Sequence, residues 1–110
     1  MSIGHFLDGK RVGGTSERRG DVFDPATGRR TDEVELASAA DVDVAVQAAA
    51  RAARSWRDAS LARRSAVLFA FRELVHARRE RLAEVITAEH GKVLADAAGE
   101  VQRGLEVIEY

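Results

Sequence analysis

The sequence predicts short β-hairpins at the N-terminus followed by about four α-helices, and three observations support this order. Up to residue 37, short apolar runs alternate with turn-forming residues, as they do in hairpins. From residue 38 onward, apolar residues recur every three or four positions, which is the period of an α-helix. Serine and glycine stand where helices should begin and end. We therefore expect a β-hairpin region at 1–37 and a helical region at 38–110.

Two hairpins are expected in the N-terminal region. The first joins a strand at 3–7 to a strand at 10–12 through Asp-Gly, a dipeptide typical of two-residue turns. The second pairs a strand at 21–23 with a strand at 33–36. In its connecting segment, 24–28, Pro25 presets the turn and Gly28 relieves its exit.

The first helix is expected to begin after Ser38. The Ser38 hydroxyl and the Asp41 carboxylate can each accept a hydrogen bond from the other residue's backbone amide, as in a capping box. The face that this helix should bury is apolar and recurs at steps of three or four. Its members are Val42, Val46, Ala49, Ala53 and Trp56.

Two more helices should follow in close succession. Ser60 can cap the second helix, which is expected to end near Ala77, and Gly91 can end the third in the left-handed conformation. Both helices carry apolar positions that should be buried. These are Leu61, Val67, Leu68, Phe71, Leu74 and Val75 in the second helix and Leu82, Val85 and Ile86 in the third.

The last helix should bury one face and carry a polar stripe on the other. The apolar face consists of Leu94, Ala97, Ala98, Val101, Leu105 and Ile108. Asp96, Glu100 and Arg103 lie nearly opposite, flanked by Gly99 and Gly104. An interior glycine costs about 1 kcal/mol relative to alanine. Either these glycines leave room beside Glu100 and Arg103 for a backbone or a ligand, or they permit close helix packing.

Composition argues against several classes of function. Fifteen of the 17 basic residues are arginine, but the formal net charge is −1, so the excess positive field that nucleic-acid binding requires is missing. No apolar run approaches the roughly 20 residues of a membrane span, and the N-terminus lacks the features of a secretory signal. We therefore expect no nucleic-acid or membrane partner and a cytoplasmic location. Without cysteine, and with His5, His76 and His90 scattered, we expect no metal site.

Four segments combine in a characteristic order and spacing. They are Phe-Asp-Pro-Ala-Thr-Gly at 23–28, Asp-Val-Asp-Val-Ala-Val at 41–46 with Ala48, Ala49 and Trp56, Arg63-Arg64 with Leu68 and Phe-Arg-Glu-Leu at 71–74, and Glu-His-Gly-Lys at 89–92. In this combination they resemble the N-terminal region of the aldehyde dehydrogenase superfamily. The resemblance implies an α/β parent protein with three αβα layers, in which 38–110 belong to the helical part of the NAD-binding domain. The catalytic and oligomerisation domains would follow Tyr110.

Two stretches near the end of the chain are similar to one branch of this superfamily. Ile-Thr-Ala-Glu-His-Gly-Lys at 86–92 and Gly-Glu-Val-Gln-Arg-Gly-Leu-Glu at 99–106 resemble the CoA-acylating methylmalonate-semialdehyde dehydrogenase branch. The resemblance implies that a parent enzyme, a homotetramer or homodimer, oxidises methylmalonate or malonate semialdehyde with NAD. Coenzyme A would take the acyl group as propionyl-CoA or acetyl-CoA with loss of carbon dioxide, in valine and inositol breakdown.

The same resemblance assigns one site residue to this chain. Arg103 would face the substrate pocket and bind the carboxylate of the semialdehyde, a task suited to a permanently charged guanidinium that can bind bidentately. The alternative is that Arg103 pairs with Glu100 or Glu106 on an exposed helix face. Glu89 and Lys92 are expected to be structural groups rather than catalytic ones.

No catalytic residue and no cofactor-binding residue is expected within the 110 residues. The nucleophilic cysteine, the oxyanion-hole donors and the main NAD-binding strands would all lie beyond Tyr110, so the chain alone should be inactive. Two other interpretations remain open. In one, the parent belongs to a branch that releases free acid; in the other, the chain is a self-contained helical interaction module that folds by itself.

Overall fold

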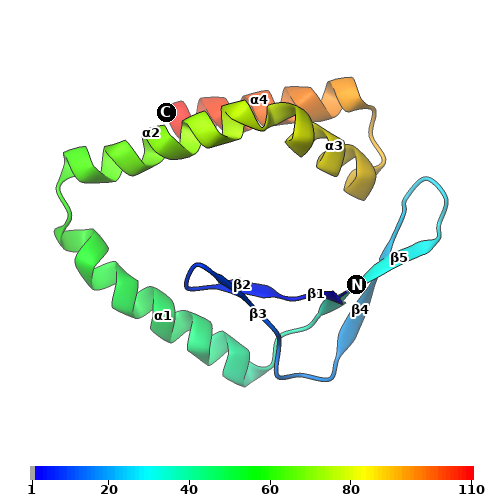
Figure 1. Cartoon of the computed structure of the whole chain (residues 1–110), viewed down its shortest axis with the longest axis horizontal. Helices are drawn as coiled ribbons and strands as arrows, with labels where there is room; N and C mark the ends of the chain where they lie inside the picture. The colour runs from blue at the N-terminus through cyan, green and yellow to red at the C-terminus, as the bar shows by residue number, and fades with distance from the viewer. Residues whose placement is uncertain (1) are drawn as a thin grey trace. The chain divides into compact units, whose positions relative to one another are not determined.

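The computed structural model describes residues 2–110, which form two compact units (Figure 1). The first unit, residues 2–23 and 29–58, contains five short strands and helix α1. The second unit consists of the turn at 24–28 and residues 59–110, which contain helices α2, α3 and α4. The predicted order of short strands followed by four helices is confirmed. The boundary between the units does not coincide with the change from strands to helices.

The first predicted hairpin is present. Its strands β2 (His5–Leu7) and β3 (Lys10–Val12) pair antiparallel. Asp8 and Gly9 connect them with φ angles of 51° and 76°. Both angles lie in the left-handed region that the tight hairpin turn requires and that aspartate and glycine tolerate. The Asp-Gly dipeptide therefore sets the register of this hairpin.

Three strands form a second sheet in the order β1-β5-β4, namely β1 (Ser2–Ile3), β5 (Arg30–Glu35) and β4 (Arg19–Phe23). β4 and β5 are antiparallel, as predicted, and β1 runs parallel to β5. The prediction of one continuous strand at 3–7 is wrong, because the chain changes sheets at Gly4. A Cβ atom there would lie 2.7 Å from the carbonyl oxygen of Val12. The close approach of two backbones thus requires glycine and interrupts the strand.

The turn between β4 and β5 has the predicted chemistry. The Gly28 amide donates to the Asp24 carbonyl oxygen at 2.8 Å, and Gly28 has a φ of 70°. The Asp24 carboxylate accepts hydrogen bonds from the amides of Ala26 at 2.8 Å and Thr27 at 3.3 Å. Aspartate therefore closes the turn from its start while glycine supplies the left-handed exit.

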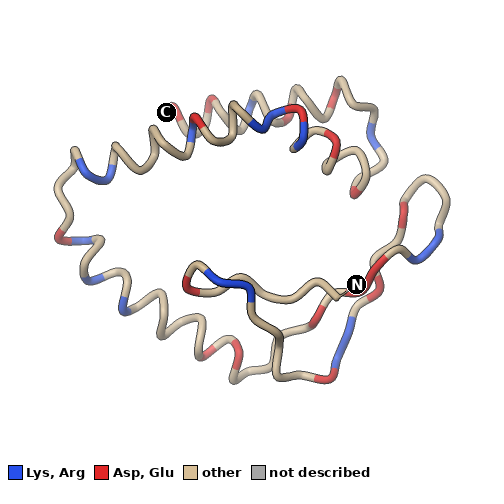
Figure 2. The backbone as a smooth tube through the Cα atoms, viewed as in Figure 1, with Lys and Arg blue, Asp and Glu red and all other residues tan. Residues whose placement is uncertain are grey.

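Helix α1 (Ala39–Asp58) begins with the predicted capping box. The Ser38 amide donates to the Asp41 carboxylate at 2.8 Å, and the Asp41 amide donates to the Ser38 hydroxyl at 3.1 Å. Acidic residues also lie at the start of α1, where they match the helix dipole, whereas a basic and an acidic residue stand side by side at its end (Figure 2). The expected burial of the apolar face is not observed within residues 2–110, where Val46 and Trp56 remain 60% and 44% exposed.

Helices α2 (Leu61–Ala77) and α3 (Arg79–His90) begin and end close to the predicted positions. The Ser60 hydroxyl accepts a hydrogen bond from the Arg63 amide at 3.2 Å, which confirms it as the cap of α2. Gly91 ends α3 with a φ of 83°, in the left-handed conformation expected for it. Local capping chemistry therefore determines these boundaries.

The core of the second unit lies where α4 (Leu94–Glu109) packs against α3 and α2. Its buried residues are Ala83, Ala97, Val101 and Leu105, and Val75 and Ile86 pack against them at its edge. Alanines at the contact of α3 with α4 let the two helices approach closely. The buried face of α4 is therefore the predicted one, although Leu94 and Ala98 are exposed.

Most of the apolar face predicted for α2 is not covered by the described residues. Its exposed members, each at least half exposed, are Leu61, Val67, Leu68, Phe71 and Leu74. Among residues 2–110, no helix combines the length and apolar character needed to cross a membrane.

Candidate functional site

Arg103 lies on the side of α4 that faces away from the core of the second unit. The positions two residues before and two residues after it, Val101 and Leu105, are both buried, which turns Arg103 outward. Its side chain is exposed, and no hydrogen bond or ion pair engages its guanidinium within residues 2–110. The structure therefore presents an exposed, permanently charged donor group that no side chain of residues 2–110 binds by a hydrogen bond or an ion pair.

The two glycines beside Arg103 border open space. A Cβ atom built at Gly99 or at Gly104 would meet no other atom within 4 Å. The explanation that these glycines permit close helix packing thus finds no partner helix in the part of the chain that the structure describes.

Glu100, one helical turn before Arg103, is bound by a lysine from outside the helix. The Lys92 Nζ atom donates a hydrogen bond to Glu100 Oε1, and the two side chains are 20% and 40% exposed. This hydrogen bond is the main reason that the pKa of Glu100 is lowered; burial opposes it, and the charges of Lys92, Arg103 and His90 add to the lowering. Glu100 is therefore an ionised carboxylate whose first partner is Lys92.

Lys92 is held at the corner between α3 and α4. Gly91, immediately before it, adopts the left-handed conformation that ends α3. A Cβ atom at Gly91 would lie 3.1 Å from the Pro25 side chain, because the turn at 24–28 packs on this corner within the second unit. Two segments singled out in the sequence, 23–28 and 89–92, thus meet in space. Their contact fixes the start of the segment that carries Lys92.

The alternative pairing considered for Arg103 is absent from the structure. Glu100 binds Lys92, and Glu106 accepts a hydrogen bond from the Gln102 side-chain amide at 3.3 Å. Glu100 and Arg103 lie three positions apart on α4, and Lys92 places a second cation against the Glu100 carboxylate. This arrangement suits the binding of one further carboxylate by the guanidinium.

Sequence reasoning placed Arg103 on the polar face but did not connect Lys92 with Glu100. The pair Lys92 and Glu100 spans the corner between two helices, so helical spacing alone does not connect them. Glu89 and His90 lie exposed at the end of α3. Residues 2–110 contain no group of three or more histidine, cysteine, aspartate or glutamate side chains placed to hold a metal ion.

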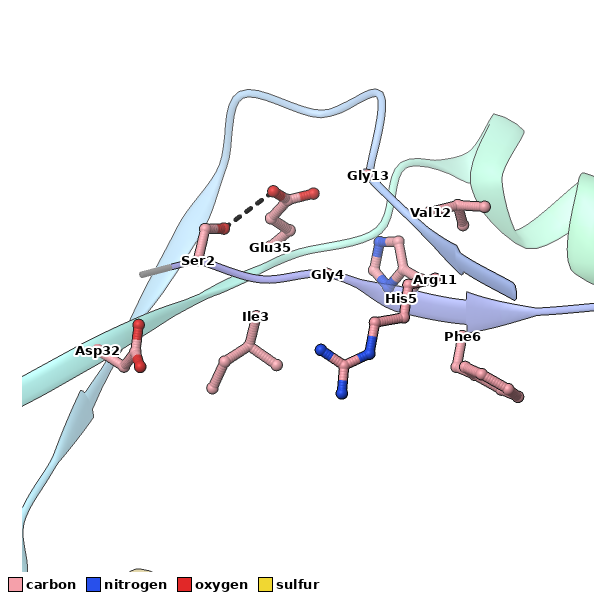
Figure 3. A pocket seen from close by; sticks show the side chains of 10 residues that line it. All are labelled: Ser2, Ile3, Gly4, His5, Phe6, Arg11, Val12, Gly13, Asp32 and Glu35. Atoms are coloured by element: carbon pink, nitrogen blue, oxygen red, sulfur yellow. Dashed lines mark hydrogen bonds between the residues drawn. The ribbon is translucent and has the colours of Figure 1, made fainter. Parts of the chain in front are cut away.

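A separate pocket of about 600 Å³ lies in the first unit (Figure 3). It is lined by residues of β1, β2 and β3 together with Asp32 and Glu35 of β5. The Glu35 carboxylate accepts hydrogen bonds from the Gly14 amide and, at 2.9 Å, from the Ser2 hydroxyl. The Gly14 bond, followed by the Ser2 bond, holds the pKa of Glu35 below its usual value. Because the chain itself occupies this carboxylate, Glu35 is a structural anchor for the loop after β3.

Comparison with known proteins yields consistent matches over nearly the whole chain. Residues 12–110 match the model of the aldehyde dehydrogenase family. Among curated proteins, the chain is 38% identical over 109 residues to malonate-semialdehyde dehydrogenase of Pseudomonas aeruginosa, and 40% identical over 109 residues to malonate-semialdehyde dehydrogenase 2 of Geobacillus thermodenitrificans. These alignments include 99% of the chain but only 22% and 23% of the relatives, so the chain spans about a fifth of their length.

Solved structures give the same pattern. A Sinorhizobium meliloti 1021 protein, assigned as a methylmalonate-semialdehyde dehydrogenase and complexed with NAD, matches with a TM-score of 0.95 and 45% identity over 99% of the chain and 22% of its own. An NAD-dependent benzaldehyde dehydrogenase from Corynebacterium glutamicum matches with a TM-score of 0.90 and 30% identity over 96% of the chain and 23% of its own.

Proposed function

The chain belongs to the aldehyde dehydrogenase family, and we propose that it forms the N-terminal part of an NAD-dependent malonate- or methylmalonate-semialdehyde dehydrogenase. Its fold is that of the corresponding region of α/β aldehyde dehydrogenases. The names of its curated relatives favour a small semialdehyde as the substrate. In this proposal, residues 38–110 belong to the helical part of the NAD-binding domain.

The observation that carries the proposed substrate class is the unpartnered Arg103 guanidinium on α4. A malonate or methylmalonate semialdehyde has an aldehyde at one end and a carboxylate at the other. Arg103 would bind the carboxylate bidentately and thereby orient the aldehyde toward the reacting groups. Open space at Gly99 and Gly104 leaves room for the carbon chain.

The reaction in this proposal is oxidative acylation of coenzyme A. The semialdehyde, CoA and NAD give acetyl-CoA or propionyl-CoA, carbon dioxide and NADH. Two electrons leave the aldehyde carbon as a hydride, the sulfur of CoA takes the acyl group, and the proton of the CoA thiol takes the place of the carboxylate lost as carbon dioxide. NAD supplies the hydride acceptor when it is bound. The role of this chain is to hold the substrate's carboxylate at Arg103.

A dinucleotide site is commonly built from a glycine-rich loop that leads into the N-terminus of a helix. The Gly-Gly-Thr-Ser loop at 13–16 leads into strand β4 rather than into a helix, so it lacks the helix N-terminus that binds a pyrophosphate. The chain also has no cysteine to serve as the nucleophile. In the proposal, both the NAD site and the thiolate come from parts of the protein outside these 110 residues, which alone should be inactive. The complete enzyme is proposed to be a cytoplasmic homotetramer or homodimer.

Replacement of Arg103 tests the proposed substrate class. In the complete enzyme, meaning residues 1–110 followed by the rest of a dehydrogenase of this family, we expect Arg103→Met to raise KM for malonate semialdehyde. The rise should be about 10- to 100-fold, because a charge-assisted hydrogen bond contributes about 1.5–3 kcal/mol. KM for propanal, which has no carboxylate, should stay the same. Equal losses with both aldehydes would rule out carboxylate binding by Arg103.

A branch of the family that releases free acid is the second candidate, favoured by the match to a benzaldehyde dehydrogenase. Product analysis separates the two. With CoA present, the acylating enzyme yields acetyl-CoA from malonate semialdehyde, whereas the other branch yields the free acid.

A further inference from the structure

The position of Arg103 in its helix creates a problem for substrate binding. Glu100 lies three residues before it and Glu106 three residues after it, and oppositely charged side chains at this spacing on a helix normally interact. A carboxylate held on the same helix is present at a high effective concentration, so it competes with any free carboxylate for the guanidinium. A substrate site at Arg103 therefore requires both glutamates to be engaged elsewhere.

The structure shows how both glutamates are engaged. Glu106 accepts a hydrogen bond from the Gln102 side chain at 3.3 Å. Glu100 accepts one from Lys92, whose side chain is only 20% exposed, whereas Arg81 in the surface ion pair with Glu84 on α3 is 75% exposed. Solvent weakens the Lys92 pair less than such a surface pair, because charges shielded from water attract each other more strongly.

Lys92 is well placed to hold Glu100 because its backbone is fixed on both sides. Gly91 before it is locked in the left-handed turn against Pro25, and α4 begins two residues after it at Leu94. The lysine therefore reaches Glu100 from outside α4 and approaches its carboxylate from the corner between the helices. Arg103 acts on the same carboxylate only through its charge.

On the basis of the proposed function, we infer that Lys92 is a positioning residue for substrate binding. By binding Glu100, it keeps the Arg103 guanidinium free for the carboxylate of the substrate. Without Lys92, Glu100 would turn to Arg103, and the net charge of Lys92, Glu100, Arg103 and Glu106 would fall from zero to −1. Lys92 touches neither the substrate nor the reacting atoms in this scheme and acts through Glu100.

A double-mutant cycle in the complete enzyme tests this role. We expect Lys92→Met to raise KM for malonate semialdehyde about tenfold, the size of a typical coupling between neighbouring charged groups, with little change in kcat. KM for propanal should not change. The double variant Lys92→Met with Glu100→Gln should bring KM for the semialdehyde back to within about twofold of the wild type, because the competing carboxylate is gone.

Two further variants complete the experiment. Lys92→Arg keeps the cation and should keep most of the affinity, whereas Lys10→Met removes the chain's only other lysine, which lies exposed in β3, and should change nothing. If Lys92→Met lowers activity equally with both aldehydes, or if Glu100→Gln fails to rescue it, Lys92 does not act by freeing Arg103. If Arg103→Met raises KM for malonate semialdehyde but not for propanal, while Lys92→Met shows no such difference, only the role inferred for Lys92 is rejected. If Arg103→Met affects malonate semialdehyde and propanal equally, the proposed substrate is rejected as well.

Discussion

Asp41 is the most heavily hydrogen-bonded carboxylate described in the chain's first unit. It is 9% exposed and accepts hydrogen bonds from the Ser38 amide and hydroxyl, each at 2.8 Å, and from the Thr15 amide at 3.1 Å. The bond from the Ser38 backbone is the largest cause that lowers its pKa to about 2, and burial opposes this effect. Asp41 therefore joins the loop after β3 to the start of α1.

The Asp41 network predicts a specific pH dependence of stability. Because the folded pKa of about 2 lies below the unfolded value of 3.8, its stabilisation should be complete above pH 3.8 and lost as the pH falls toward 2. In the complete enzyme, Asp41→Asn should lower Tm at neutral pH, and the Tm difference from the wild type should shrink in acid. Asp43→Asn, an exposed change two positions further along the same helix turn, is the control and should shift Tm little. A Tm difference that stays constant down to pH 2.5 would contradict the assignment.

Helix ends were predictable from the sequence because nearby side chains determine them. Ser38 and Ser60 cap the helices that follow them, and Gly91 ends α3, all through hydrogen bonds or φ angles set within a few residues. The interruption at Gly4 was not predictable, because its cause is the carbonyl oxygen of Val12, which approaches only after the hairpin has formed. The pairing of Lys92 with Glu100 was not predicted either, because the two residues meet only once the corner between α3 and α4 has formed. Arg103 could be placed on the polar face, but its lack of a partner depends on that pairing.

Two left-handed glycines of the second unit should differ in how much stability is lost when alanine replaces them. Gly28 and Gly91 have φ angles of 70° and 83°, but only a Cβ atom at Gly91 would meet another residue, the Pro25 ring at 3.1 Å. Gly28→Ala should lower the free energy of unfolding by about 1–2 kcal/mol from backbone strain alone. Gly91→Ala should cost about 1–3 kcal/mol more from the added overlap.

Urea denaturation of the complete enzyme and its two variants measures this difference. Equal losses of stability for Gly28→Ala and Gly91→Ala would mean that Pro25 does not pack closely against Gly91. The backbone before Lys92 would then not be fixed by this contact.

At the scale of the whole molecule, the apolar residues outnumber the buried sites that the chain provides. Only Ala83, Ala97, Val101 and Leu105 are buried apolar residues among residues 2–110, and two of these four are alanines. Meanwhile Phe69 and Phe71 of α2 are 72% and 50% exposed. Large apolar surfaces that stay in contact with water favour association.

The isolated 110 residues should therefore be marginally stable and prone to self-association. Analytical ultracentrifugation should show concentration-dependent oligomers, and thermal unfolding should lack a sharp cooperative transition. A monomer with a cooperative melt and well-dispersed amide resonances would instead support the self-contained helical module. The matched comparison is the complete enzyme, in which we expect one cooperative transition.

The contact of Pro25 with Gly91 also has a consequence for synthesis on the ribosome. More than sixty residues separate the two positions, so the turn emerges well before the corner on which it packs. At about 5–20 residues per second, this delay is on the order of 3–13 s. Throughout that interval the tip of the nascent hairpin has no partner to pack against, so the corner of the second unit can form only after residue 91 has been synthesised.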